Sequence, residues 1–202
     1  MMKIIFISFL LIALILASCN QSLKLSQEDF DWMPYKGNET LVFRTNSKES
    51  DTLFIQKKDT MIAYPEAQAI NGKQCEEVAV FSKSSGGDDR GSGRSFYLFK
   101  VQKAKDGQTN LSFDLSIKGA TFYRLLPVNA DSLSKVKPSL VKTISQQFDD
   151  VYVIYPDDLS KDFSDRSNFV TKLYWSKSKG LIRFDKKDST YWELEKKILD
   201  IV

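Results

Sequence analysis

Apolar and polar residues alternate strictly over residues 111–118, and this pattern constrains the fold more than any other feature of the chain. The apolar positions are Leu111, Phe113, Leu115 and Ile117, with polar side chains between them. Successive side chains on a strand point to opposite faces of a sheet, so this spacing predicts a strand with one buried and one solvated face. A helix cannot bury such a pattern on one side.

The same two-residue period recurs in short segments separated by turn-forming residues. The predicted strands are residues 40–44, 51–55, 75–81, 95–102, 111–118, 121–126, 151–155, 169–175, 181–184 and 191–194. Most of them are joined by short loops, whereas parallel strands need crossovers of about a dozen residues or more. We therefore expect a mainly β, antiparallel fold: a strongly curved sheet that forms an incomplete barrel, or a two-sheet sandwich.

Residues 131–148 break this pattern. Their apolar side chains recur at mostly helical intervals, namely Leu133, Val136, Leu140, Ile144 and Phe148. This spacing predicts one or two short helices around 131–148, separated by Pro138. Because Val141 and Thr143 are β-branched, an extended conformation of residues 141–148 is the alternative.

The chain contains no histidine, although histidine is the commonest general base and a common zinc ligand. We therefore expect no metal, no cofactor and no catalytic residue. The net charge of +3 is small and the charges are interspersed, which argues against a nucleic-acid partner. Of the two cysteines, Cys75 begins a predicted strand and is expected to be a small buried residue rather than half of a disulfide.

The N-terminus has the organisation of an export signal. A basic start at residues 1–3 precedes an apolar run over residues 4–16 and two small residues. This pattern predicts a secretory signal peptide, because the run is shorter than the roughly 20 residues of a spanning helix. Since Cys19 directly follows the small pair, the segment resembles the lipobox of bacterial lipoproteins. The alternatives are an ordinary signal peptide with an incidental cysteine and an uncleaved membrane anchor.

The lipobox resemblance implies the domain organisation. Residues 1–18 would be a removable lipoprotein signal peptide, residues 19–33 a polar tether and residues 34–202 a single β-rich domain. Lipidation of Cys19 would make a membrane the first partner. By the same resemblance, Asn20 in place of an aspartate favours delivery to the outer membrane of the cell envelope.

Three further stretches carry a second resemblance. They are residues 34–37 (Pro-Tyr-Lys-Gly), residues 39–43 followed by Asp51-Thr52, and residues 173–182 (Leu-Tyr-Trp-Ser-Lys-Ser-Lys-Gly-Leu-Ile). In these stretches the chain resembles a broad class of uncharacterised Bacteroidota lipoproteins. The resemblance implies a lipid-anchored, β-rich domain and transfers no activity.

One glycine-rich stretch has the composition of a binding loop. Residues 84–94 lie between two predicted strands and hold four of the nine glycines. Glycine-rich backbone can surround an anion, and Arg90 and Arg94 would supply positive charge, so these two arginines are the candidate ligand-binding residues. The spacings of the known phosphate-binding loops are missing, and the alternative is a plain hairpin connection.

Carboxylates and aromatic residues suggest weaker sites. The aspartates at residues 157–165 offer oxygen ligands for calcium, yet aspartate is also an ordinary turn residue. The pairs Asp149-Asp150 and Glu76-Glu77 cannot face one another, because neighbours on a strand point to opposite sides. An aromatic sugar platform competes with a simple core role for Trp32, Trp175, Trp192, Tyr174 and Tyr191.

These observations predict a non-catalytic binding or structural module of the cell envelope, whose partner is an envelope protein or a small apolar ligand. The first alternative is a carrier or chaperone for an apolar ligand or a lipoprotein, which requires a concave apolar cavity. The second is a carboxylate-based hydrolase, which requires two facing carboxylates.

Overall fold

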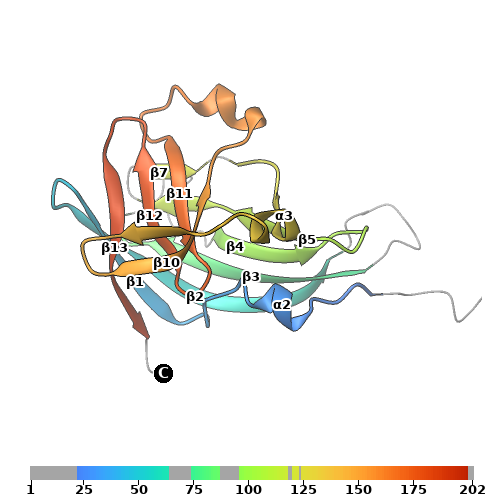
Figure 1. Ribbon diagram of the computed structural model, residues 1–202. Helices are drawn as coiled ribbons and strands as arrows, with labels where there is room; N and C mark the ends of the chain where they lie inside the picture. The colour runs from blue at the N-terminus through green and yellow to red at the C-terminus, as the bar shows by residue number, and fades with distance from the viewer. Residues whose placement is uncertain (1–21, 64–73, 87–95, 118–119, 123, 200–202) are drawn as a thin grey trace, which may run out of the picture.

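The computed structural model describes residues 22–63, 74–86, 96–117, 120–122 and 124–199. Over these ranges the protein is mainly β, and its main feature is an eleven-stranded antiparallel sheet that curls into a half-barrel (Figure 1). The predicted fold class is confirmed, in the form of a curved sheet rather than a sandwich.

The main sheet contains β1 (Glu39–Thr45), β2 (Ser50–Ala63), β3 (Cys75–Ser84), β4 (Phe96–Lys103), β5 (Thr109–Phe113), β8 (Val128–Asn129), β9 (Ser139–Lys142), β10 (Gln147–Ile154), β11 (Val170–Ser176), β12 (Gly180–Lys186) and β13 (Tyr191–Leu199). A separate hairpin contains β6 (Leu115–Ile117) and β7 (Ala120–Phe122). The described helices are α2 (Gln27–Phe30), α3 (Ala130–Ser134) and the 3-10 helix η1 (Asp158–Phe163). None of these helices is long and apolar enough to cross a membrane.

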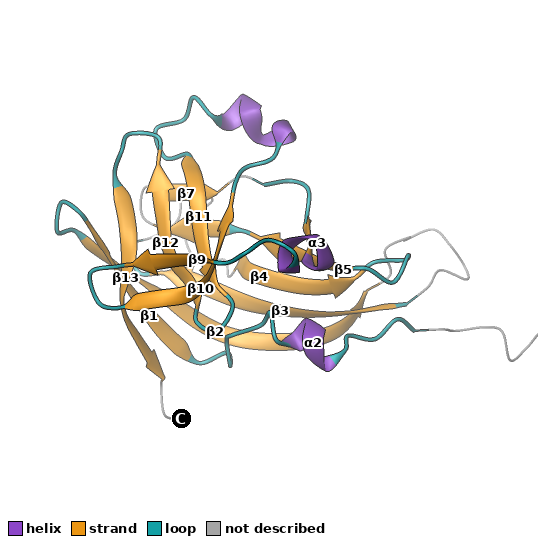
Figure 2. Cartoon of the chain, in the orientation of Figure 1, coloured by secondary structure: helices purple, strands orange, loops and turns teal. Residues whose placement is uncertain are grey.

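The strand order links the two ends of the chain. It runs β8-β5-β4-β3-β2-β1-β13-β12-β11-β10-β9, so the first and last strands pair in the middle of the sheet. The two edge strands, β8 and β9, are consecutive in the chain and are connected through α3 (Figure 2). One short helix therefore joins the two open sides of the half-barrel.

The alternating segment is buried as predicted but belongs to two sheets. All four of its apolar side chains are buried, namely Leu111, Phe113, Leu115 and Ile117. The chain leaves the main sheet at Asp114, whose N–H donates to the carbonyl of Leu98 on β4 (3.0 Å). The following β6–β7 hairpin contacts the main sheet through a bridge between Thr121 and Phe169.

Within residues 131–148 the structure has one short helix followed by strands. α3 begins after Asn129, whose side chain accepts the N–H of Ser132 (2.8 Å). The extended alternative holds for half of residues 141–148: residues 141–142 end β9 and residues 147–148 begin β10, with a turn between them. Leu140 and Ile144 are 65% and 66% exposed, so the four-residue spacing does not mark one buried helix face.

Aromatic side chains fill the interior of the half-barrel. The ring of Trp175 on β11 packs against Phe99 (4.2 Å between centroids), Phe113 (5.2 Å) and Tyr35 (5.8 Å). The core interpretation is confirmed for all three tryptophans, because each is buried: Trp32, Trp175 and Trp192.

The prediction that residues 19–33 form a polar tether is wrong from residue 22 onward. The N–H of Leu23 donates to the carbonyl of Gln74, and its carbonyl accepts the N–H of Glu76 (both 2.8 Å). This places Leu23 beside Cys75, whose side chain is fully buried, as predicted for that residue. Three of the five apolar side chains in residues 22–33 are buried, namely Leu25, Trp32 and Met33, and the other two, Leu23 and Phe30, are half-buried.

Asp29 holds α2 against the β4–β5 hairpin. Ser26 and Asp29 form a reciprocal capping box at the start of the helix. The Asp29 carboxylate also accepts the Thr109 hydroxyl (2.5 Å) and pairs with Lys103 (2.8 Å). Burial alone would raise the pKa of Asp29, but hydrogen bonds from Lys103, Thr109 and Ser26 outweigh it and lower that pKa below its ordinary value.

Candidate functional site

Glu39, the first residue of β1, has a carboxylate that the preceding loop encloses. Its side chain accepts the N–H groups of Lys36 (2.6 Å), Gly37 (2.9 Å) and Asn38 (3.1 Å). The loop closes this tightly because Gly37 has φ +104°, and a Cβ there would lie 2.5 Å from the backbone nitrogen of Lys58. Consecutive amides of this kind stabilise a negative charge.

Lys197 on β13 supplies the opposite charge. Its Nζ lies 3.8 Å from Oε1 of Glu39 and donates to the carbonyls of Pro34 (3.2 Å) and Lys179 (3.3 Å). Burial lowers the pKa of Lys197, the charge of Glu39 opposes this, and repulsion from Lys179 and Lys36 lowers it further. The ammonium groups of Lys36 and Lys179 are therefore both close enough to Lys197 to repel it.

These lysines line a pocket of about 620 Å³, which we call the lysine pocket. In the described part of the chain, the Lys36 and Lys179 ammonium groups have no ion-pair or hydrogen-bond partner. Glu195 also lines the pocket, but it pairs with Arg44 (2.9 Å). The full lining is Pro34, Lys36, Glu39, Ser145, Gln146, Ser178, Lys179, Glu195, Lys197 and Leu199.

Tyr35 connects the lysine pocket to the core. Its hydroxyl accepts the N–H of Leu181 (2.8 Å), and burial raises the pKa of this phenol. The Lys197 ammonium lies 4.5 Å from the centroid of the Tyr35 ring, within cation–π range. Because Tyr35 also packs on Trp175, the pocket is attached to a rigid support.

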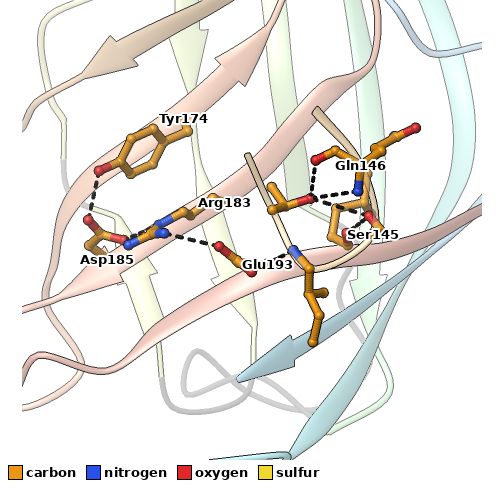
Figure 3. Close-up of polar contacts among 9 residues, drawn as sticks. Ser145, Gln146, Tyr174, Arg183, Asp185 and Glu193 are labelled. Carbon is orange, nitrogen blue, oxygen red and sulfur yellow. Dashed lines mark hydrogen bonds and ion pairs between the residues drawn. The ribbon is translucent and has the colours of Figure 1, made fainter. Parts of the chain in front are cut away.

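A second polar cluster lies on β11, β12 and β13 (Figure 3). Nε of Arg183 donates to Asp185 (2.7 Å) and Nη1 donates to Glu193 (3.0 Å). The Tyr174 hydroxyl donates to the other oxygen of Asp185 (2.8 Å), and burial together with this bond raises the pKa of Tyr174 to about 12. Tyr191 lies under the guanidinium at 4.1 Å.

Glu193 joins this cluster to the tip of the β9–β10 hairpin. Its second oxygen accepts the N–H of Ile144 (3.0 Å), and the Ser145 hydroxyl donates to the carbonyl of Leu194 (2.9 Å), as Figure 3 shows in part. The tip thus separates the lysine pocket from a smaller pocket of about 250 Å³ that Ile144 and Glu193 help to line. All four carboxylate oxygens of Asp185 and Glu193 accept donors, which indicates a structural role.

The residues that the sequence singled out as sites fall outside the described residues: Cys19, Arg90 and Arg94. Only the start of the glycine-rich stretch is described. There the hydroxyls of Ser84 (2.7 Å) and Ser85 (2.5 Å) and the N–H of Gly86 (2.9 Å) donate to Asp51. At these three residues, the donors that could surround an anion are bonded to the carboxylate of Asp51.

The remaining carboxylates are dispersed. Asp150 accepts the Ser176 hydroxyl and the Ser178 N–H (both 2.7 Å); burial opposes their effect, but they lower the pKa of Asp150. Asp157 caps η1 by accepting the N–H of Ser160 (2.9 Å). Among the described residues no group of three or more acidic or cysteine side chains is arranged to hold a metal ion.

Sequence reasoning missed the lysine pocket, because its lysines are isolated residues on separate segments. Two of these lysines, Lys36 and Lys179, lie within residues 34–37 and 173–182, stretches that the sequence analysis singled out for another reason.

No protein-family model matches the chain, and no curated protein and no solved structure matches it significantly.

Proposed function

We propose that the protein is a lipid-anchored module of the cell envelope, attached through Cys19, which binds an anionic ligand in the lysine pocket. It acts by binding and catalyses no reaction. One observation carries the proposal: Lys36 and Lys179 line the same pocket as Lys197, repel it and have no partner of their own in the described chain.

The charge balance favours an anion. Glu39 offsets only one of the three lysines, while Arg44 already neutralises Glu195. A carboxylate, phosphate or sulfate group between Lys36 and Lys179 would relieve their repulsion of Lys197. The ligand class is therefore a molecule with such a group, and the volume of about 620 Å³ admits a small molecule or one end of a larger one.

The two alternative functions have less support. A carrier needs an apolar cavity, whereas Trp175, Phe99 and Phe113 pack together in the described core. A hydrolase needs two facing carboxylates that reach substrate, whereas Asp185 and Glu193 are both occupied by Arg183.

Ligand binding is tested by thermal unfolding with increasing pyrophosphate, against sodium chloride at matched ionic strength. The wild type should be stabilised as RT ln(1 + [L]/Kd), about 2.7 kcal/mol at a hundredfold excess over Kd. The double variant Lys36→Gln/Lys179→Gln should lose this effect and be at least as stable as the wild type without ligand, because repulsion is removed.

The matched control is Lys135→Gln/Lys172→Gln, which changes two exposed lysines outside the pocket. It should respond to pyrophosphate like the wild type. Equal stabilisation of all three proteins, or of none, would contradict binding in the lysine pocket.

The anchor is tested separately with Cys19→Ala in the full chain. This variant should no longer incorporate a palmitate analogue and should leave the membrane fraction. Unchanged labelling and unchanged fractionation would refute acylation at Cys19.

A further inference from the structure

Leu23 lies beside Cys75, the first residue of β3, at one end of the β2–β3 hairpin. It forms a parallel bridge with Cys75, and Cys75 pairs on its other side with Ala63 of β2. Two backbone hydrogen bonds of 2.8 Å, to Gln74 and from Glu76, fix its position. The first described residues are thus part of the sheet and not a loose leader.

The direction of this bridge places Ser22 and Gln74 together. Because Leu23 bridges Cys75 in the parallel sense, the residue before each of them lies at the same end of β3. Only residues 20–22 separate Leu23 from Cys19. At roughly 3.6 Å per residue, four steps allow a lipidated Cys19 to lie at most about 14 Å from Leu23.

The hairpin beside this attachment point presents apolar side chains to solvent. Met61 is 36% exposed and Ile62 is 46% exposed, and these two residues come just before Ala63, the last residue of β2. The β1–β2 register ends at the pair Thr40–Phe54, so the last part of β2 continues beyond β1 with β3 as its partner. Neighbouring residues on a strand point to opposite faces, so Met61 and Ile62 present one apolar side chain to each face, beside Glu77 and Glu76 on β3.

We infer that this end of the β2–β3 hairpin faces the bilayer and that Met61 and Ile62 contact its interface. The inference rests on the proposed acylation of Cys19, since a lipid held within about 14 Å brings the hairpin end to the membrane surface. A bilayer fits as the occupant, because it can contact both faces of a projecting hairpin, whereas a protein groove would cover one.

The inference also fixes the orientation of the domain. β2 has 14 residues, so its first residue, Ser50, lies about 40 Å along the strand from its last at about 3.3 Å per residue. Ser50 and the β1–β2 turn therefore face away from the membrane.

The test uses the full chain, isolated in its acylated form and reconstituted in vesicles of phosphatidylethanolamine and phosphatidylglycerol. Ile62→Cys and Ser50→Cys are each labelled with an environment-sensitive fluorophore, since Cys75 is buried and Cys19 is acylated. We expect nitroxide-labelled lipid to quench the probe at residue 62 and its emission to shift to the blue, with neither change at residue 50. Equal quenching at both positions, or quenching only at residue 50, overturns the orientation.

A linker insertion tests whether the short connection between Cys19 and Leu23 is what keeps residue 62 at the membrane. Ten Gly/Ser residues placed between Ser22 and Leu23 should leave the protein in the membrane fraction while quenching at residue 62 is lost, because the flexible linker releases the domain. Retained quenching overturns the role of the tether. If the wild type is membrane-bound but not quenched at residue 62, only this inference fails; if it is not membrane-bound, the proposed anchor fails with it.

Discussion

The side chain of Tyr35 occupies the space that a side chain at residue 180 would need: a Cβ on Gly180 would lie 2.3 Å from the Tyr35 hydroxyl oxygen. Gly180 has φ +89°, which L-residues rarely adopt. The contact joins the N-terminal segment to the β11–β12 turn. Since Lys36 follows Tyr35 and Lys179 precedes Gly180, it also sets the spacing of the two partnerless lysines of the pocket.

Gly180→Ala should therefore be strongly destabilising. Overpacking costs about 1–3 kcal/mol and the left-handed backbone about 1–2 kcal/mol, so we expect a loss of about 3 kcal/mol in the free energy of unfolding by urea. Gly107→Ala is the matched control, because Gly107 has φ +84° but a Cβ there would meet nothing within 4 Å. It should lose only about 1 kcal/mol. Similar losses at both positions would show that the Tyr35 contact does not matter.

The lowered pKa of Asp29 predicts a pH-dependent contribution to stability. A carboxyl group whose folded-state pKa is depressed stabilises the fold above its ordinary value of 3.8, and this contribution is lost as the pH falls through the folded-state pKa. Asp29→Asn should lower the free energy of unfolding by about 1.5–3 kcal/mol at pH 7, the range for hydrogen bonds to charged groups. The difference from the wild type should shrink below pH 4.

Asp31→Asn serves as the control for the Asp29 experiment, because Asp31 is exposed and ends the same helix. A surface change of this kind should stay within about 0.5 kcal/mol of the wild type at both pH values. A penalty for Asp29→Asn that is equally large at pH 7 and pH 3 would show that packing, and not charge, is responsible.

The strand pattern predicted most of the sheet because burial on one face places an apolar residue at every second position of a strand. The pairs β1–β2, β3–β4 and β11–β12 follow from this alternation. The break at Asp114 does not, because the alternation of apolar and polar residues continues unchanged across it from β5 into β6. The integration of residues 22–33 was missed because the buried side chains Leu25, Trp32 and Met33 are scattered among polar residues and show no regular spacing.

The lysine pocket was less predictable than the fold. Its charges come from three separate segments, and only the pairing of Glu39 with Leu199 across β1 and β13 brings Lys197 next to the loop at residues 36–38. No local spacing encodes that pairing, because it joins the first and last strands of the main sheet, which are far apart in the sequence. The burial that lowers the pKa of Lys197 is likewise a property of the assembled structure.

The buried N-terminal segment predicts where the domain can be truncated. A chain that begins at Ser22 should unfold cooperatively, whereas one that begins at Pro34 lacks α2 and the side chains of Leu25, Trp32 and Met33. Loss of a buried Trp alone costs about 3–5 kcal/mol, a large part of the total stability of about 5–15 kcal/mol expected for a domain. Thermal unfolding followed by circular dichroism should give a much lower midpoint for the shorter chain. Equal midpoints would return residues 22–33 to the role of a tether.

The contact between Glu193 and the hairpin tip predicts a local change in amide hydrogen exchange. Glu193→Ala removes the acceptor of the Ile144 N–H, a charged hydrogen bond worth about 1.5–3 kcal/mol, so exchange at Ile144 should accelerate by about tenfold or more. Glu195→Ala is the matched control, because Glu195 lies two residues along β13 and pairs with Arg44. It should leave the Ile144 amide unchanged. Equal acceleration in the two variants would mean that the tip is held by the strand as a whole and not by the Glu193 carboxylate.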